Sequence, residues 1–184
     1  EAGEFSWFGG GADLTPIYLY EDDAVYFHKK LQDAVGDKEL FQSLKIACDN
    51  YFYLHHRQEA RGIGGVFYDY LGKNGQKERE KGYALCESLG NAFCDAYFPI
   101  LKIRKDMQFS EKEREFQLLR RGRYVEFNLL FDRGTLFGVR TNGRPASVLA
   151  SLPPLASWNN EFVPEKGSAE ERMFAVLRSP RDWV

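Results

Sequence analysis

The sequence contains few sulfur-bearing and imidazole side chains, and it lacks any long apolar run. Its three cysteines, Cys48, Cys86 and Cys94, are odd in number and are not closely paired. This excludes a disulfide framework and a zinc ribbon, so we expect buried structural thiols in a reducing compartment. No stretch approaches the roughly 20 apolar residues of a membrane-spanning helix. The opening residues EAGEFSW lack the features of a secretory signal, so we expect neither a membrane span nor export.

The chain also lacks a charge excess of either sign. Its 25 basic and 27 acidic residues are interspersed and give a formal net charge of −2. Such a chain has no bulk field to attract nucleic acid, so we expect no nucleic-acid partner. An anionic ligand would therefore have to be bound by arginines at one place in the fold. The alternative role for some of these arginines is an ion pair with a neighbouring carboxylate. The candidates near predicted turns are Arg57, Arg61, Arg120, Arg121, Arg123, Arg133, Arg140 and Arg144.

Three consecutive glycines stand directly before an aspartate in WFGGGADLTP, Trp7 to Pro16. Glycines can bring backbone N–H groups close to a phosphate, but neither GGGADL nor GIGGVF completes a dinucleotide-binding pattern, and no Gly-Lys-Ser/Thr follows. A bulge or tight turn in a sheet explains the glycines structurally. In the functional alternative the glycines keep this role, and the turn also holds Asp13 in place. Its carboxylate would then accept hydrogen bonds from N–H groups of a flat ligand.

The three histidines are His28, His55 and His56. His28 lies on the apolar stripe of a predicted helix, where a buried, hydrogen-bonded side chain is the commoner role. A pair of histidines from two successive helices could bind a metal ion, but no cysteine or HExxH spacing supports this reading.

Helical spacing of apolar residues predicts helices at residues 21–35, 39–57, 76–104, 110–121 and 168–177. Pro99 should kink or divide the third of them. Capping boxes, Ser110 with Glu113 and Ser168 with Glu171, open the last two.

Period-two alternation predicts strands as well. They cover residues 4–8, 61–71, 123–134 and 135–140, with a type I′ hairpin at Thr141-Asn142-Gly143-Arg144 before the apolar run 147–155. Helices and strands are segregated along the chain, so we expect an α+β fold with an antiparallel sheet. No linker or repeat divides the sequence, so we expect one domain over residues 1–184.

Four long blocks together resemble one known family. They are WFGGGADLTP, YFYLHHRQEARGIGGVFYDYL, RGRYVEFNLLFDRGTLFGVRTNGRPASVLASLPP and the terminal PRDWV. In this order they closely resemble oxygen-dependent coproporphyrinogen III oxidase, the aerobic enzyme of haem biosynthesis. The resemblance implies a large antiparallel β-sheet flanked by α-helices on both sides, and a homodimer in the cytoplasm or, in some eukaryotes, in the mitochondrial intermembrane space.

The same resemblance implies oxidative decarboxylation of two propionates of coproporphyrinogen III to vinyl groups, which gives protoporphyrinogen IX. Molecular oxygen is consumed, carbon dioxide and hydrogen peroxide are released, and no organic cofactor is needed. Asp13 matches an aspartate proposed to contact the pyrrole N–H groups, and Arg133 lies in the DRG segment associated with the catalytic site. The residues that match a substrate-binding loop are Asn142, Gly143 and Arg144.

Two further features follow from the resemblance. His28 and His56 match positions sometimes assigned to a divalent metal, and the stretch Tyr124 to Trp158 corresponds to a segment linked to dimerisation. The family's N-terminal third, which carries the histidine named as proton donor, does not occur in these 184 residues, so we expect this stretch alone to be inactive. The alternatives are a non-catalytic tetrapyrrole-binding or dimerisation module and a metal-dependent oxygenase that uses the two histidines.

Overall fold

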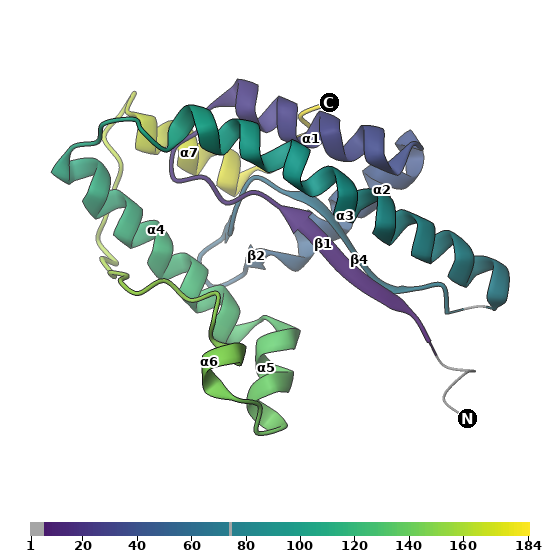
Figure 1. The fold of residues 1–184 in the computed structure, drawn as a ribbon. Coiled ribbons are helices and arrows are strands. Elements are labelled where there is room, and N and C mark those ends of the chain that lie inside the picture. Colours follow the sequence, from purple (N-terminus) through teal and green to yellow (C-terminus); the bar gives the residue numbers. More distant parts are fainter. Residues whose placement is uncertain (1–5, 74) are drawn as a thin grey trace. The chain divides into compact units, whose positions relative to one another are not determined.

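The computed structural model describes residues 6–73 and 75–184 and forms two compact units (Figure 1). The first unit comprises Glu1–Met107 with Ala175–Val184, and the second comprises Gln108–Phe174. In chain order the elements are β1 (Phe8–Asp13), α1 (Glu21–Val35), α2 (Lys38–Tyr51), β2 (Tyr53–Leu54), β3 (Glu59–Ala60), β4 (Gly65–Leu71), α3 (Gln76–Arg104), α4 (Glu111–Leu130), α5 (Arg133–Arg140), α6 (Pro145–Val148) and α7 (Ala169–Arg178).

Strands β1 and β4 form an antiparallel pair at the centre of the first unit. Ala12 pairs with Val66 and Asp13 with Gly65, and the register shifts between Phe8 and Gly10. A Cβ on Gly65 would stand 2.0 Å from the carbonyl oxygen of Ala12, so only glycine permits this close approach of the strands. The register shift and the tight contact confirm the structural reading of the glycine-rich segments.

Helices α1 and α2 cover the sheet with apolar residues at helical spacing, and both begin or end at a recognisable cap (Figure 1). Asp37 accepts a hydrogen bond from the Leu40 N–H at 3.0 Å, and Gly36 closes α1 in the left-handed conformation at φ 72°. Helix α1 has the predicted bounds. Helix α2 ends at Tyr51 rather than near residue 57, because the chain turns there into the β2–β3 hairpin.

Helix α3 is continuous across Pro99, so the predicted division of this helix did not occur. Proline lacks an N–H and leaves the carbonyl oxygen four residues before it without its usual donor. That oxygen belongs to Asp95, and the Tyr26 hydroxyl of α1 donates to it at 3.0 Å. A neighbouring helix thus supplies the hydrogen bond that proline cannot make.

The predicted large antiparallel sheet is wrong: the described residues form only two small two-stranded sheets, and the fold is mainly helical. The capping box of Ser110 and Glu113 is confirmed, but α4 continues through residues 123–130, where we predicted a strand. Helix α5 replaces the next predicted strand, and α6 overlaps the start of the apolar run at residues 147–155. The alternation was misleading because Phe116, Leu119 and Phe127 also share one buried helical face.

The cysteines differ in their surroundings. Cys48 is buried, as predicted, and burial raises the pKa of its thiol. Cys86 is half-buried and accepts a hydrogen bond from the Tyr68 hydroxyl at 3.2 Å. Cys94 is exposed, so the expected burial of all three thiols is wrong for this one. None of the helices in the described part of the chain is long and apolar enough to cross a membrane.

Candidate functional site

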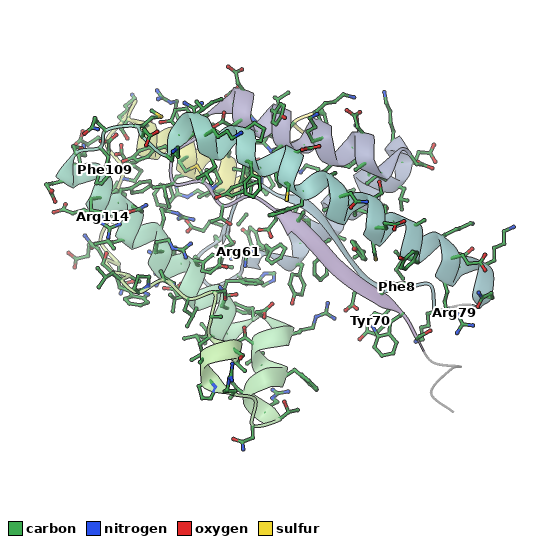
Figure 2. The ribbon with its side chains drawn as sticks, in the orientation of Figure 1. Phe8, Arg61, Tyr70, Arg79, Phe109 and Arg114 are labelled. Atoms are coloured by element: carbon green, nitrogen blue, oxygen red, sulfur yellow. The ribbon has the colours of Figure 1, made fainter. Side chains whose placement is uncertain are left out.

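Asp13 is the last residue of β1, and its carboxylate forms an ion pair with Arg61. The Arg61 side chain is labelled in Figure 2. Its Nη2 donates to Asp13 Oδ2 at 2.6 Å, and the side chains of Arg61 and Asp13 are 8% and 17% exposed. A charge-assisted hydrogen bond of this length fixes the carboxylate in one orientation. The other oxygen, Oδ1, accepts no hydrogen bond from the described residues. Asp13 therefore has one oxygen held by the protein and one available for a ligand.

Arg61 is itself held by aromatic side chains. Its guanidinium carbon lies 4.0 Å from the centre of the Phe52 ring, and its backbone N–H donates to the Phe52 carbonyl at 2.8 Å. Phe52 contacts Tyr51 and Phe67 in an aromatic cluster in which Tyr51 and Phe67 stack at 4.1 Å. Because a guanidinium stacked on a ring loses little freedom when it pairs, this cluster preorganises the contact with Asp13.

The loop at residues 62–64 fixes the backbone beside the ion pair. The Ile63 N–H donates to the Leu14 carbonyl at 2.9 Å, and the Leu14 N–H donates to the Gly64 carbonyl at 3.0 Å. A Cβ on Gly62 would stand 2.4 Å from the Leu14 oxygen, so the loop can approach this closely only as glycine. The glycines of GIGG therefore allow the backbone of this loop to pack closely against Leu14, the residue that follows Asp13.

His28 is fully buried in α1, as the sequence predicted. Burial lowers the pKa of the imidazole to about 4; Lys45 also lowers it, while the hydrogen bond to Ala24 and the charge of Asp182 raise it. The ring is consequently neutral at physiological pH, and its Nδ1 lies 2.8 Å from the Ala24 carbonyl oxygen, to which it donates. Its Nε2 has no hydrogen-bond partner among the described residues.

His56 lies in different surroundings, exposed in the turn between β2 and β3. Among the described residues, no group of three or more histidine, cysteine, aspartate or glutamate side chains could hold a metal ion. One buried and one exposed imidazole do not by themselves make a metal centre. We therefore derive no catalytic step through a metal.

The other predicted site residues lie in the second unit. Arg133 begins α5 and is exposed, and the Asp132 side chain caps this helix by accepting from the Thr135 N–H at 2.7 Å. Asn142 and Gly143 connect α5 to α6, where Arg144 precedes the first helical residue. The structure thus places Arg133 at the start of α5 and Arg144 directly before α6.

The turn between α5 and α6 is not the predicted type I′ hairpin, because helices rather than strands flank it. Asn142 adopts the left-handed conformation at φ 57°, which asparagine tolerates better than most residues. The Gly143 N–H donates to the Gly138 carbonyl at 2.7 Å and closes the turn. The residues NGR were correctly recognised as a turn, but their neighbours were assigned to the wrong element.

A cavity of about 340 Å³ also lies within the second unit. Aromatic and aliphatic side chains line it together with charged ones, namely Lys112, Glu115, Phe116, Leu119, Ser157, Asn159, Phe162 and Glu170. None of the predicted site residues is among them. This cavity therefore adds nothing to the site built around Asp13.

Comparison of the sequence with models of known families identifies the family of this chain. Residues 1–183 match the family model described as coproporphyrinogen III oxidase. The chain belongs to the coproporphyrinogen III oxidase family. Its reaction is the oxidative decarboxylation of coproporphyrinogen III in haem biosynthesis, and the protein is accordingly an oxidoreductase. The recognised sequence blocks are thereby confirmed as family features.

Sequence reasoning named Arg61 only as one of eight arginines and missed its contact with Asp13. The two residues are 48 positions apart, so no local pattern joins them. A signal was present all the same, because Arg61 directly precedes GIGG as Asp13 directly follows GGGA. Two glycine-rich segments in extended stretches can pair closely, and such pairing places the residues at their ends together.

Proposed function

We propose that Asp13 is the residue of this oxidase that accepts hydrogen bonds from the pyrrole N–H groups of coproporphyrinogen III. The observation that supports this proposal is that the two carboxylate oxygens of Asp13 have different partners. Oδ2 is fixed by Arg61 at 2.6 Å, while Oδ1 receives no hydrogen bond from the described residues. A pyrrole N–H donor would give Oδ1 a charge-assisted partner without breaking the ion pair.

Such hydrogen bonds raise the electron density of the pyrrole ring, from which dioxygen can then take electrons. For each propionate, the side chain –CH2–CH2–COO⁻ loses carbon dioxide and becomes –CH=CH2, which releases two electrons and one proton. Dioxygen takes up the two electrons and two protons, one of them from the medium, and becomes hydrogen peroxide. The porphyrinogen is the reductant in this scheme, so neither a flavin nor another organic cofactor enters the balance. Dioxygen is the co-substrate.

The propionates are assigned to the exposed arginines of the second unit. Arg133 and Arg144 offer planar guanidinium groups, which bind carboxylates in a bidentate manner. The side-chain amide of Asn142, in the turn between α5 and α6, would contribute donors beside them, and Gly143 would keep the turn closed through its hydrogen bond to the Gly138 carbonyl. Orientation of the macrocycle by its carboxylates would determine which propionate reacts.

The second unit also supports the proposed homodimer. Helices α5 and α6 bury none of their residues, and Phe137 and Val139 of α5 are 67% and 61% exposed. Large apolar side chains that gather on one short helix are typical of an interface. We place the two-fold contact in the segment from Tyr124 to Trp158, with the same surface contributed by both subunits.

Asp13→Asn in the full-length protein tests the role of Asp13. The amide keeps the shape but removes the charge, and we expect protoporphyrinogen formation to fall roughly hundredfold, the size of effect that loss of one preorganised electrostatic group produces. Asp69→Asn provides the control, because Asp69 lies on β4 of the same sheet. Near-normal turnover of Asp13→Asn would remove this carboxylate from the mechanism.

A further inference from the structure

The C-terminal segment PRDWV belongs to the first unit, and the proposed reaction does not use it. Three consecutive residues of this segment contact the helices and the loop of the same unit. We call Arg181–Trp183 the C-terminal strap. Arg181 lies 4.3 Å from the Trp183 ring centre and donates to Glu21 Oε1 at 2.7 Å. Asp182 accepts a hydrogen bond from Gln42 at 3.0 Å. The strap thus contacts both α1 and α2.

The indole of Trp183 makes the most informative contact of the strap. Its Nε1 donates to the Ile63 carbonyl oxygen at 3.0 Å, in the loop that separates Arg61 from Gly65. The N–H of the same residue, Ile63, donates to Leu14 at 2.9 Å. Ile63 is therefore held on one side by the strap and on the other by the residue next to Asp13.

Both members of the ion pair are close along the chain to these hydrogen bonds, Asp13 by one residue and Arg61 by two. Leu14 follows Asp13, and Gly62 separates Ile63 from Arg61. The loop packs closely on the chain beside Asp13, because a Cβ at Gly62 would stand 2.4 Å from the Leu14 oxygen. We therefore expect a displacement of Ile63 to move Leu14, Arg61 or both.

We propose that Trp183 is a positioning residue for the Asp13–Arg61 pair. The inference rests on the proposed role of Asp13. It adds that the C-terminal strap helps to hold the loop that contacts this residue's neighbour, Leu14. The Arg181–Glu21 ion pair is solvent-exposed, with side chains 44% and 66% exposed, and ion pairs of this kind contribute little stability. Asp182 lies 3.8 Å from the buried Lys45, but its own side chain is 61% exposed. The indole is the half-buried part of the strap: its ring lies 6.1 Å from that of the buried His28, and its polar atom points at the loop beside the site.

The test is Trp183→Phe in the full-length protein, which keeps an aromatic ring and removes the N–H donor. Trp7→Phe is the matched control, because Trp7 also contacts a ring, that of Tyr70 with centroids 5.4 Å apart, but makes no hydrogen bond to a described residue. We expect kcat/KM to fall roughly tenfold in Trp183→Phe, since small displacements of a reacting group are costly, and to stay within about twofold of wild type in Trp7→Phe.

A double-mutant cycle with Asp13→Asn separates positioning from general stability. If Trp183 acts through Asp13, Trp183→Phe should lower kcat/KM by less than about twofold once Asp13→Asn is present. Amide hydrogen exchange at residues 61–65 should become faster in Trp183→Phe and remain unchanged in Trp7→Phe. This readout reports the loop contact whatever the activity.

Two results would overturn the inference: equal losses from Trp183→Phe in the two backgrounds, or unchanged exchange at residues 61–65. Near-normal activity of Asp13→Asn alone would instead refute the proposed role of Asp13. The two failures are therefore distinguishable, because the first concerns the coupling between two residues and the second concerns one residue alone.

Discussion

The two units of this protein differ in how completely they cover their own apolar residues. In the first unit, α1, α2 and α3 join β1 and β4 in one buried cluster that includes Phe27, Phe41 and Val66. In the second, α4 has a buried face, but α5 and α6 bury no residue at all. A unit with a complete core can position a carboxylate by itself. The second unit instead exposes apolar side chains on α5, which the proposed homodimer would cover.

The largest effect is expected where the core of the first unit is tightest. Gly65→Ala would place a Cβ 2.0 Å from the Ala12 oxygen and 2.8 Å from the Asp13 Cα, which forces β1 and β4 apart. We expect the free energy of unfolding to fall by about 4 kcal/mol, at the upper end for single substitutions. Chemical denaturation monitored by circular dichroism measures it.

Gly90→Ala is the control for this experiment. Gly90 is exposed in α3, and an added Cβ there meets no heavy atom within 4 Å. Alanine should stabilise the helix by about 1 kcal/mol, because it loses less backbone entropy than glycine. A destabilised Gly90→Ala, or an unaffected Gly65→Ala, would contradict the tight packing that we assign to the first unit.

The next effect concerns the pH dependence of the first unit. His28 has a pKa of about 4 in the folded protein against 6.5 when unfolded, so the unfolded state takes up a proton first as the pH falls. The stability that neutral His28 contributes is complete above pH 6.5 and is lost between pH 6.5 and 4, by about 3 kcal/mol in total. Asp49 acts in the opposite direction, because burial raises the pKa of its carboxyl group.

His28→Asn isolates the contribution of the imidazole. Asparagine can still donate to the Ala24 carbonyl but does not titrate, so the free energy of unfolding should fall less steeply between pH 6.5 and 4 than in wild type. His55→Asn serves as the control, since His55 is exposed in the β2–β3 turn. Urea denaturation at several pH values gives both slopes, and parallel curves for His28→Asn and wild type would show that His28 is not the group responsible.

Much of the first unit could be predicted from the sequence, because its signals are local and agree with one another. The bounds of α1, the start of α3 and a glycine-dependent irregularity before Asp13 follow from spacing and residue type, whereas the pairing of β1 with β4 was not predicted. The second unit misled us because one pattern fits two periods. From Tyr124 onward apolar residues alternate as in a strand, yet Phe127 continues the buried face of α4, and no helix stop appears before Asp132.

The candidate site was predictable only in part, for a similar physical reason. Asp13 stands out because glycines precede it, but its partner Arg61 is brought to it by tertiary packing across 48 residues. Trp183 is 120 residues away from Ile63 along the chain, and a hydrogen bond to a backbone carbonyl leaves no mark on the sequence of the acceptor. Contacts of this kind require the fold.

The exposed helices of the second unit give a prediction about assembly. Phe137→Asp would place a charge at a side chain that is 67% exposed, so folding of the subunit should be little affected. If α5 lies in the two-fold interface, each subunit would bury one aspartate there. We therefore expect the dimer dissociation constant to rise at least a hundredfold, which is the effect of a hot-spot residue. Sedimentation measures it. Val163→Asp, at an 80% exposed residue outside the segment from Tyr124 to Trp158, should leave the constant unchanged.

The smallest effect compares one cap in each unit. Asp37→Ala removes the acceptor for the Leu40 N–H at the start of α2, and Asp132→Ala removes the acceptor for the Thr135 N–H at the start of α5. Each lost cap should cost about 1 kcal/mol of helix stability.

In the first unit the buried face of α2 keeps the helix in place, so the loss should appear only as a lower free energy of unfolding. Helix α5 has no buried face, so loss of its cap should instead increase amide exchange within residues 133–140 and leave the global value nearly unchanged. If both variants lowered global stability equally, α5 would be as firmly packed as α2, and the contrast between the two units would not hold.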